Sequence, residues 1–380
     1  MQAHVADDHQ RVFTILSIAI TAALGGFLFG YDTAVINGAV SSIEATFQTS
    51  ASMLGLTVSS ALLGSAAGAL VAGWLADRFG RRPSMLLAAV MFLLSAVGSA
   101  LAPRLVDLVI WRVVGGVAVG FASVLAPAYI AEISPAAMRG RTGSLQQLAI
   151  VLGIFISLLF NYLIVLATSD QEPTSLVGPM AAWRWMLMAE VVPALLYGVL
   201  VLRIPESPRY LVRIGHLDQA RKVIRRTIGE PTQEVIDRIQ ASQGRRGSGS
   251  IRDLFSRRSG LLPIVWTGVL LATFQQLVGI NVIFYYSSEL WQSVGFSTTE
   301  SLSVTVITAV TNVVTTFLAI ATIDRLGRRP LLLLGSVVMT VSLGLMSWTF
   351  AGAPLEVGMP VLSGASSVLA LVCANVFVFA

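Results

Sequence analysis

Charged residues are scarce in this chain of 380 residues. Asp, Glu, Lys and Arg together make up 12% of it, whereas a water-soluble globular domain carries about a quarter. Hydrophobic residues reach 55%, and the mean hydropathy is +0.78. This deficit of charge excludes an ordinary soluble domain and indicates a chain that folds within a lipid bilayer.

Cysteine and histidine are almost absent as well. The one cysteine, Cys373, lies in an apolar run, which excludes an intramolecular disulfide and a cysteine-ligated metal cluster. The three histidines, His4, His9 and His216, all fall outside the apolar runs. No zinc-protease, serine-hydrolase, CxxC or phosphate-loop motif occurs. The sequence therefore predicts no metal, no cofactor and no enzymatic activity.

Ten apolar runs provide the material for membrane-spanning helices. A helix needs about 20 residues to cross a bilayer, and it satisfies every backbone polar group internally. The polar start at 1–10 lacks the basic region and the cleavage site of a signal peptide, so the first run is predicted to remain as a span. The predicted fold class is an all-α integral membrane protein. The runs lie near 12–40, 54–75, 84–101, 105–131, 143–166, 183–202, 261–291, 302–323, 331–350 and 360–380.

The basic residues are distributed unevenly between the two sides of the membrane. Of the 25 Lys and Arg residues, 22 lie in the N-terminal tail or in the loops after the second, fourth, sixth and eighth runs. Only Arg104 lies in a loop on the opposite side. This positive-inside pattern predicts that the N-terminus and the long central loop are cytoplasmic. The pI of 9.8 thus reflects topology and does not predict nucleic-acid binding.

A repeated string divides the chain into two related halves. ADRFGRRPSMLLAAV from Ala76 recurs as IDRLGRRPLLLLGSV from Ile323, at an offset of 247 residues, and in both halves it joins the second run to the third. We therefore expect an N-terminal bundle of six helices at 1–202, a cytoplasmic linker with short amphipathic helices at 203–259, and a C-terminal bundle at 260–380. Four runs follow the linker, so the second bundle is predicted to be truncated after about four helices.

Six strings, in order along the chain, resemble signatures of the sugar porter family of the major facilitator superfamily. They are GGFLFGYDTAVINGAV from Gly25, GWLADRFGRRP from Gly73, EISPAAMRGR from Glu132, PESPRYL from Pro205, FQQLVGINVIFYY from Phe274 and IDRLGRRP from Ile323. The resemblance implies a major facilitator fold, with two six-helix bundles that alternate access to a central site. We expect a monomer in the cell membrane whose partners are a sugar, a proton and the lipid bilayer.

Asp32 and Arg112 are opposite charges at similar depth. Asp32 lies about ten residues, roughly 15 Å, from the outer end of its helix, and Arg112 about seven residues, roughly 10 Å, from the outer end of its own. Either charge alone would cost about 2.5 to 3.5 kcal/mol at the bilayer centre, so the two are expected to face the interior and pair. The resemblance implies that the pair couples transport to protons. The alternative is a static ion pair that holds two helices together.

Several runs contain amide and hydroxyl side chains. Such groups suit a neutral polyol, because they donate and accept hydrogen bonds without a counter-ion. On an ideal helix Gln276 and Asn281 point about 140° apart, so both face one cavity only if the helix bends, which Gly279 permits. The alternative for each candidate is an interhelical hydrogen bond. The predicted sugar-binding residues are Gln147, Gln275, Gln276, Asn281, Tyr285, Asn312 and, by resemblance, the aromatic Phe29.

Two further sets of charges are candidates. Glu190 is an intramembrane acid, for which the resemblance suggests a secondary, protonation-linked role; the alternative is a structural hydrogen bond to the backbone of a neighbouring helix. Charges at the cytoplasmic helix ends are implied by the resemblance to form a network that closes the inner gate. The alternative is a solvated cluster that only sets topology. The network residues are Asp77, Arg81, Glu132, Arg139, Arg141, Glu206, Arg209, Asp324 and Arg328.

The predicted function is import of a neutral monosaccharide, a hexose or a pentose, by proton symport. One rival is a facilitator of the same fold that carries sugar without protons, and Asp32 argues against it. The other rival is a sugar sensor or a nonfunctional fragment. The linker is too small for an obvious signalling domain, which disfavours a sensor, whereas the truncated second bundle favours a fragment.

Overall fold

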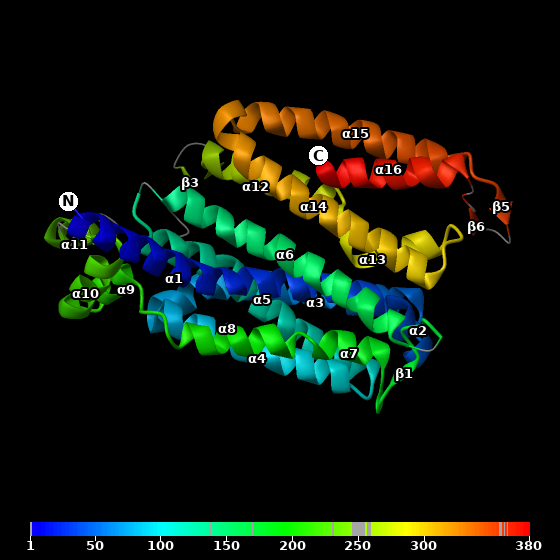
Figure 1. The fold of residues 1–380 in the computed structure, drawn as a ribbon, viewed down its shortest axis with the longest axis horizontal. Coiled ribbons are helices and arrows are strands. Elements are labelled where there is room, and N and C mark those ends of the chain that lie inside the picture. The colour runs from blue at the N-terminus through cyan, green and yellow to red at the C-terminus, as the bar shows by residue number, and fades with distance from the viewer. Residues whose placement is uncertain are drawn as a thin grey trace.

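The computed structural model describes residues 2–136, 138–168, 170–229, 232–244, 255–256, 260–356, 359–360, 362 and 364–380. Within these ranges it describes the backbone but not the side chains of 2–10, 242–244, 255–256, 260–261, 323–325, 328, 355–356 and 359–360. Long helices run side by side along the molecule (Figure 1). In chain order the elements are α1 (Gln2–Val35), the 3-10 helix η1 (Ile36–Ala39), α2 (Val40–Phe47), α3 (Ala51–Phe79), α4 (Arg81–Leu101), α5 (Leu105–Ile133), α6 (Arg139–Leu166), β1 (Leu176–Val177), β2 (Met180–Ala181), α7 (Ala182–Met188), α8 (Val191–Val201), α9 (Pro208–Arg213), α10 (Leu217–Thr227), α11 (Thr232–Gly244), β3 (Phe255–Ser256), β4 (Gly260–Leu261), α12 (Pro263–Leu277), α13 (Ile280–Gln292), α14 (Thr298–Leu326), α15 (Arg328–Ala351), β5 (Leu355–Glu356), β6 (Met359–Pro360) and α16 (Ala365–Phe379).

Nine helical segments of the described chain are long and apolar enough to cross a membrane. Three of them continue across a break: α1, η1 and α2 form the span Arg11–Phe47, α7 and α8 form Ala182–Val201, and α12 and α13 form Pro263–Gln292. The last predicted run is present as α16, whose 15 residues fall short of a full span. The prediction of an all-α membrane protein is thus confirmed. The sequence did not predict the breaks in the first and sixth spans.

The internal repeat recurs in the backbone. α14 begins and ends 247 residues after α3, and α15 begins 247 residues after α4. Gly80 and Gly327, at equivalent places, adopt φ angles of +101° and +81°, a conformation that favours glycine and separates the two helices. A kink outside the repeated string also recurs: Ala39 has φ −110° and ψ −11°, and Tyr286, at the same offset, has φ −125° and ψ 16°. The two halves are therefore related in three dimensions as well as in sequence.

Glycines let helices of the N-terminal half approach closely. The spacing of Gly64 and Gly68 predicts close packing, and a Cβ atom added at either would collide with a backbone carbonyl oxygen of α5. α1 and α6 meet in the same way. A Cβ atom at Gly30 would collide with a carbonyl oxygen of α6, and one at Gly153 with a carbonyl oxygen of α1. These contacts hold α1, which carries Asp32, in a fixed position inside the half.

The two halves of the chain are joined at the helix ends that lie away from the N-terminus. Asn37 in η1 donates from Nδ2 to the carbonyl oxygen of Phe284 on α13 (3.1 Å), and its own carbonyl oxygen accepts from Ser288 Oγ (2.8 Å). Asn37 and Phe284 are separated by the repeat offset, so the contact joins equivalent positions of the two repeats. Leu158 of α6 also packs with Phe284 and with Ala309 of α14.

Short helices follow the N-terminal half. Ser207 precedes α9 and accepts a hydrogen bond from the backbone N–H of Tyr210 (3.4 Å), and Pro208 occupies the first position of the helix. α9, α10 and α11 share a small apolar core that includes Leu211 and Ile224. α10 and α11 fall where the amphipathic pattern of the linker predicts helices. The rest of the linker, at 245–254 and 257–259, lies outside the described residues.

Candidate functional site

Asp32 and Arg112 form a buried ion pair between α1 and α5. Arg112 Nη1 lies 2.9 Å from Asp32 Oδ1, and the two side chains are 1% and 2% exposed. The same nitrogen lies 3.3 Å from the Asp32 carbonyl oxygen. Gly115, three residues after Arg112, leaves space for Ser95 and for the carboxylate, because a Cβ atom there would collide with Ser95 Oγ and lie 3.3 Å from Asp32 Oδ1. The expected pairing is confirmed, while its part in proton coupling stays a prediction.

Only some of the hydrogen-bond donors of Arg112 have an acceptor. Arg112 Nε and Nη2 are buried and donate no hydrogen bond to any described residue. A buried charge whose donors are incompletely paired is costly, and such groups are rare in stable cores. Arg112 therefore has free donors for a second acceptor, either a water molecule or another carboxylate.

Glu190 is a buried carboxylate that could act as this second acceptor for Arg112. It lies between α7 and α8, where Pro193 has no N–H to continue the helix, and it is 2% exposed. Its charge interacts with those of Asp32 and Arg112, and its Oε1 atom accepts no hydrogen bond from the described residues. The alternative of a structural hydrogen bond to a neighbouring backbone finds no partner at this atom.

The predicted bend in the seventh span is confirmed. α12 ends at Leu277 and α13 begins at Ile280, and Gly279 between them has a φ angle of +86°. Because of this bend, Asn281 Nδ2 donates to Gln276 Oε1 at 2.8 Å. Two amides that point apart on a straight helix are thus brought into contact and present their remaining donors and acceptors together.

Tyr285 brings the second half of the chain to the ion pair. This residue of α13 is 4% exposed. Its hydroxyl group interacts with the side chain of Thr33, and it lies close enough to Asp32 and Arg112 to interact with their charges. A sugar-binding candidate on one half therefore interacts with the region of the other half that carries the proton-coupling candidate.

The remaining sugar-binding candidates lie on separate helices. Gln147 of α6 and Gln275 of α12 have exposed side chains, and Asn312 of α14 is half-buried. Phe29 of α1 is half-buried against the apolar core of the N-terminal half. Among the described residues none of the four hydrogen-bonds to Gln276 or Asn281. Their convergence on one sugar stays a prediction.

Sequence reasoning missed three buried amides. Asn37 joins the halves, as described above, and Asn161 Nδ2 donates to the carbonyl oxygen of Val35 (3.0 Å), where α1 gives way to η1. Gln146 is 7% exposed, and both of its amide atoms lack a partner among the described residues. Their signal was available, since an amide within an apolar run needs a partner.

Part of the predicted charge network is assembled within the N-terminal half. Arg81 binds Glu132 through two hydrogen bonds of 2.9 and 3.0 Å and Asp77 at 3.1 Å. Glu206 accepts from the backbone N–H groups of Arg81 and Arg82 (2.9 and 3.1 Å), so its carboxylate lies at the positive end of α4. Arg213, which was not predicted, also binds Asp77 at 3.1 Å.

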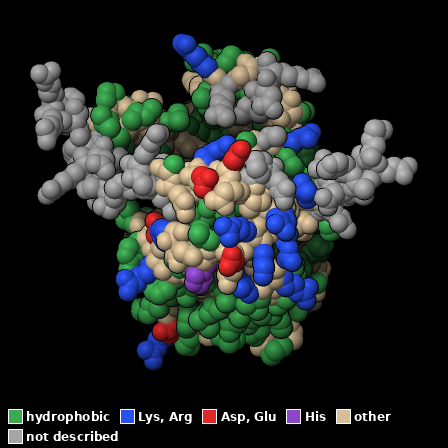
Figure 2. Space-filling view, turned by 90° about the vertical axis from the view of Figure 1, so that its left-hand side faces the viewer, with side chains coloured by type: hydrophobic (Ala, Val, Ile, Leu, Met, Phe, Trp, Pro, Cys, Tyr) green, Lys and Arg blue, Asp and Glu red, His purple; other side chains and the backbone are tan. Residues whose placement is uncertain are grey.

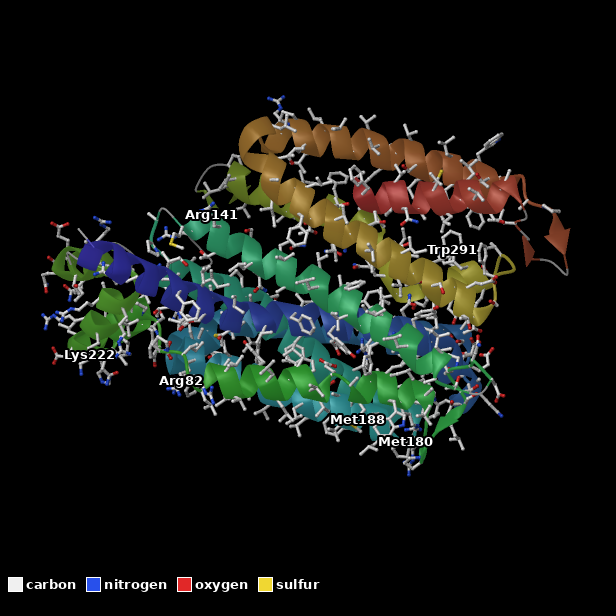
Figure 3. The ribbon with its side chains drawn as sticks, in the orientation of Figure 1. Arg82, Arg141, Met180, Met188, Lys222 and Trp291 are labelled. Carbon is white, nitrogen blue, oxygen red and sulfur yellow. The ribbon has the colours of Figure 1, made fainter. Side chains whose placement is uncertain are left out.

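Two other members of the predicted network, Arg139 and Arg141, lie apart from these. Arg139 and Arg141 are exposed at the start of α6, and Figure 3 shows Arg141 there, apart from Arg82 at the start of α4. Arg209 also has an interaction partner. The side chains of Asp324 and Arg328, which belong to the second half, lie outside the described residues. The structure thus assembles four of the nine predicted residues: Asp77, Arg81, Glu132 and Glu206.

Comparisons with known proteins agree on one family. The family model described as sugar (and other) transporter matches residues 18–380. The glucose transport protein of a Synechocystis strain is 54% identical over 365 residues, which cover 96% of this chain and 78% of that protein. The xylose transporter XylE from Escherichia coli, in a partially occluded inward-open conformation, aligns with a TM-score of 0.81 and 34% identity over 96% of this chain and 83% of that one. XylE described as a major facilitator superfamily proton:xylose symporter, bound to 6-bromo-6-deoxy-D-glucose, aligns with a TM-score of 0.81 and 34% identity over 97% of this chain and 79% of that one.

Proposed function

This chain belongs to the sugar (and other) transporter family, and on that premise we propose that it imports a neutral monosaccharide together with a proton. Its multi-pass helical fold is that of the major facilitator superfamily. The names of the relatives mention transport of glucose and of xylose. We therefore propose a hexose or a pentose as the substrate, and glucose is the first sugar to test.

One observation carries the proposal of proton coupling. Asp32 and Arg112 are buried and paired, and Tyr285 from the other half interacts electrostatically with both charges. A proton bound at Asp32 would weaken the attraction to Arg112 and change the contact with α13, while a sugar held by Gln276 and Asn281 acts on the same helix. Inward proton flow supplies about 2.3 kcal/mol per charge for each 100 mV of membrane potential, enough to concentrate sugar nearly fifty-fold.

The same proposal places the molecule in its membrane. We place the N-terminus and the linker on the cytoplasmic side of the cell (inner) membrane, since most basic residues lie in those segments and loops. The contact of Asn37 with Phe284 and Ser288 then closes the outer end. The N-terminal bundle, the linker and the C-terminal bundle at 1–202, 203–259 and 260–380 act as the moving parts of a monomer, and the network residues of the two bundles meet when the inner end closes.

Uptake by the purified protein in proteoliposomes tests this function. With an inwardly directed proton gradient, glucose or xylose should accumulate above its outside concentration, and collapsing the gradient with a protonophore should return it to equilibrium. Saturable uptake that only ever equilibrates would instead identify a proton-independent facilitator. Sugar binding without any uptake would identify a sensor or a nonfunctional fragment.

Replacing the paired amides of the seventh span should weaken sugar binding. Gln276→Ala or Asn281→Ala removes a hydrogen-bond partner of a sugar hydroxyl, which costs about 1 to 3 kcal/mol, or roughly 5-fold to 150-fold in affinity. Isothermal titration calorimetry, in which sugar is added to the purified variant, measures the loss of affinity. Gln292→Ala, at the end of α13, is the matched control and should bind normally. Normal affinity in both test variants would move the sugar site elsewhere.

A further inference from the structure

A cavity of 350 Å³ lies between α1, α8 and α10, near the end of the molecule that carries the N-terminus. Three basic side chains line it: Arg203 just after α8, and Lys222 and Arg226 on α10. No Asp or Glu occurs among the described residues that line it. The cavity is therefore bordered by three exposed basic residues, and no carboxylate of the described lining neutralises them. Figure 2 shows this end of the molecule, where Lys and Arg side chains gather, and Figure 3 shows Lys222 on α10.

The three cations are unpaired within the part of the chain that the structure describes. None of their side chains makes a hydrogen bond or an ion pair there. Other basic residues nearby do have partners: Arg221 on the same helix binds Asp218 at 3.0 Å, and Arg82 donates to the carbonyl oxygen of Val201 at 3.3 Å. Three like charges around one cavity repel one another, so a bound anion would stabilise this arrangement.

The rest of the lining selects the kind of anion. Hydroxyl groups of Ser17, Thr21 and Thr227 donate to carbonyl oxygens of their own helices at 2.8, 2.8 and 2.9 Å. Thr14 also has an interaction partner, so the cations are the main donors that remain. Two guanidinium groups and one ammonium group match the oxygens of a phosphate, because guanidinium groups bind phosphate through two parallel hydrogen bonds. A phosphate monoester carries about two negative charges, more than a single carboxylate offers to three cations.

We infer that this cavity binds the phosphate group of an anionic ligand and that the bound phosphate fastens α10 to α1 and α8. Thr14, Ser17 and Thr21 belong to the N-terminal part of the first apolar span, so the cavity lies toward one end of that span. The phosphate of an anionic phospholipid and that of a soluble phosphate monoester share the chemistry that the cavity recognises.

Thermal unfolding of the purified protein in phosphatidylcholine nanodiscs tests the site. One arm adds phosphatidic acid to the nanodisc lipid, and the other adds glycerol 3-phosphate to the buffer. The test variant is Arg203→Gln/Lys222→Gln/Arg226→Gln. Its matched control, Arg104→Gln/Arg221→Gln/Arg238→Gln, removes the same number of charges outside the cavity. We expect the unfolding temperature of the unaltered protein and of the control to rise with at least one probe, and each neutralised cavity cation to weaken binding roughly tenfold.

The pattern across the two arms identifies the source of the phosphate. A rise with phosphatidic acid alone assigns the site to a lipid headgroup, a rise with glycerol 3-phosphate alone assigns it to a soluble ester, and either supports the site if the test variant loses it. Without probe, the test variant should unfold at the same or a higher temperature, since it lacks the repulsion. The inference is overturned if neither probe raises the unfolding temperature, or if test and control variants lose the effect equally. The measurement needs no transport, so its outcome is independent of the proposed symport.

Discussion

Asp32→Asn should abolish accumulation of sugar against its gradient while leaving exchange of sugar across the membrane intact. Asparagine keeps the shape of the side chain and removes the group that binds the proton, so the variant imitates protonated Asp32 permanently. The bundles can then still alternate, but no proton is bound on one side and released on the other. The measurement compares sugar counterflow with proton-driven accumulation on the same reconstituted variant.

Asp107→Asn provides the control for this variant. Asp107 lies in the first turn of α5, on the helix that carries Arg112 but away from the ion pair. Its replacement should leave both counterflow and accumulation unchanged. Accumulation by Asp32→Asn under an imposed proton gradient would show that Asp32 is not the coupling residue, and Glu190 would then be the next candidate because of its burial beside the pair.

Arg112→Met should destabilise the protein more than any other single change at the site. Methionine fits an apolar interior, but it leaves Asp32 buried without its cation and Glu190 beside it, so two carboxylates share one apolar region. Removing one partner of a buried pair typically costs about 3 to 5 kcal/mol. Thermal or denaturant unfolding of the purified variant in detergent measures the loss.

The double variant Asp32→Asn/Arg112→Met distinguishes the stabilising interaction within the pair from the separate effect of each residue. It removes both charges, so it should recover most of the stability that Arg112→Met loses. Asp32→Asn alone should cost less than Arg112→Met, since the charge of Glu190 still interacts favourably with that of Arg112. Equal losses in the two single variants, or a double variant no more stable than Arg112→Met, would contradict the view that the pair is held by its charges.

Several features of the site can be predicted from the positions of residues along the sequence alone. Hydropathy places the spans, because a bilayer demands long apolar helices whatever surrounds them. Depth along the spans suffices to pair Asp32 with Arg112, since two buried charges of opposite sign have few other partners. The bend at Gly279 follows from the angular distance between Gln276 and Asn281 on a regular helix. In each case a residue's position along its own helix decides the outcome.

Other features depend on which helix faces which. Glu190 lies at the break between α7 and α8, and its charge interacts with those of Asp32 and Arg112, which its position in the sequence does not indicate. The predicted charge network shows the same limit: Arg81, Glu132 and Glu206 converge within one half, whereas Arg139 and Arg141 stay apart from them. A charge at a helix end has many reachable partners, and only the packing of the helices selects among them.

The sequence by itself determined the class of the protein, its spans, its two related halves and its family. Composition, the repeat offset and short motifs indicate these features, and all three can be read along the chain without knowing which residues are in contact. Only the tertiary structure decided that Asn37 meets its own equivalent, Phe284, across the halves and that Arg203, Lys222 and Arg226 surround one cavity. Such contacts join segments far apart in the chain. Their geometry is set by close packing of helices through glycines, which brings side chains together without a pattern along the sequence.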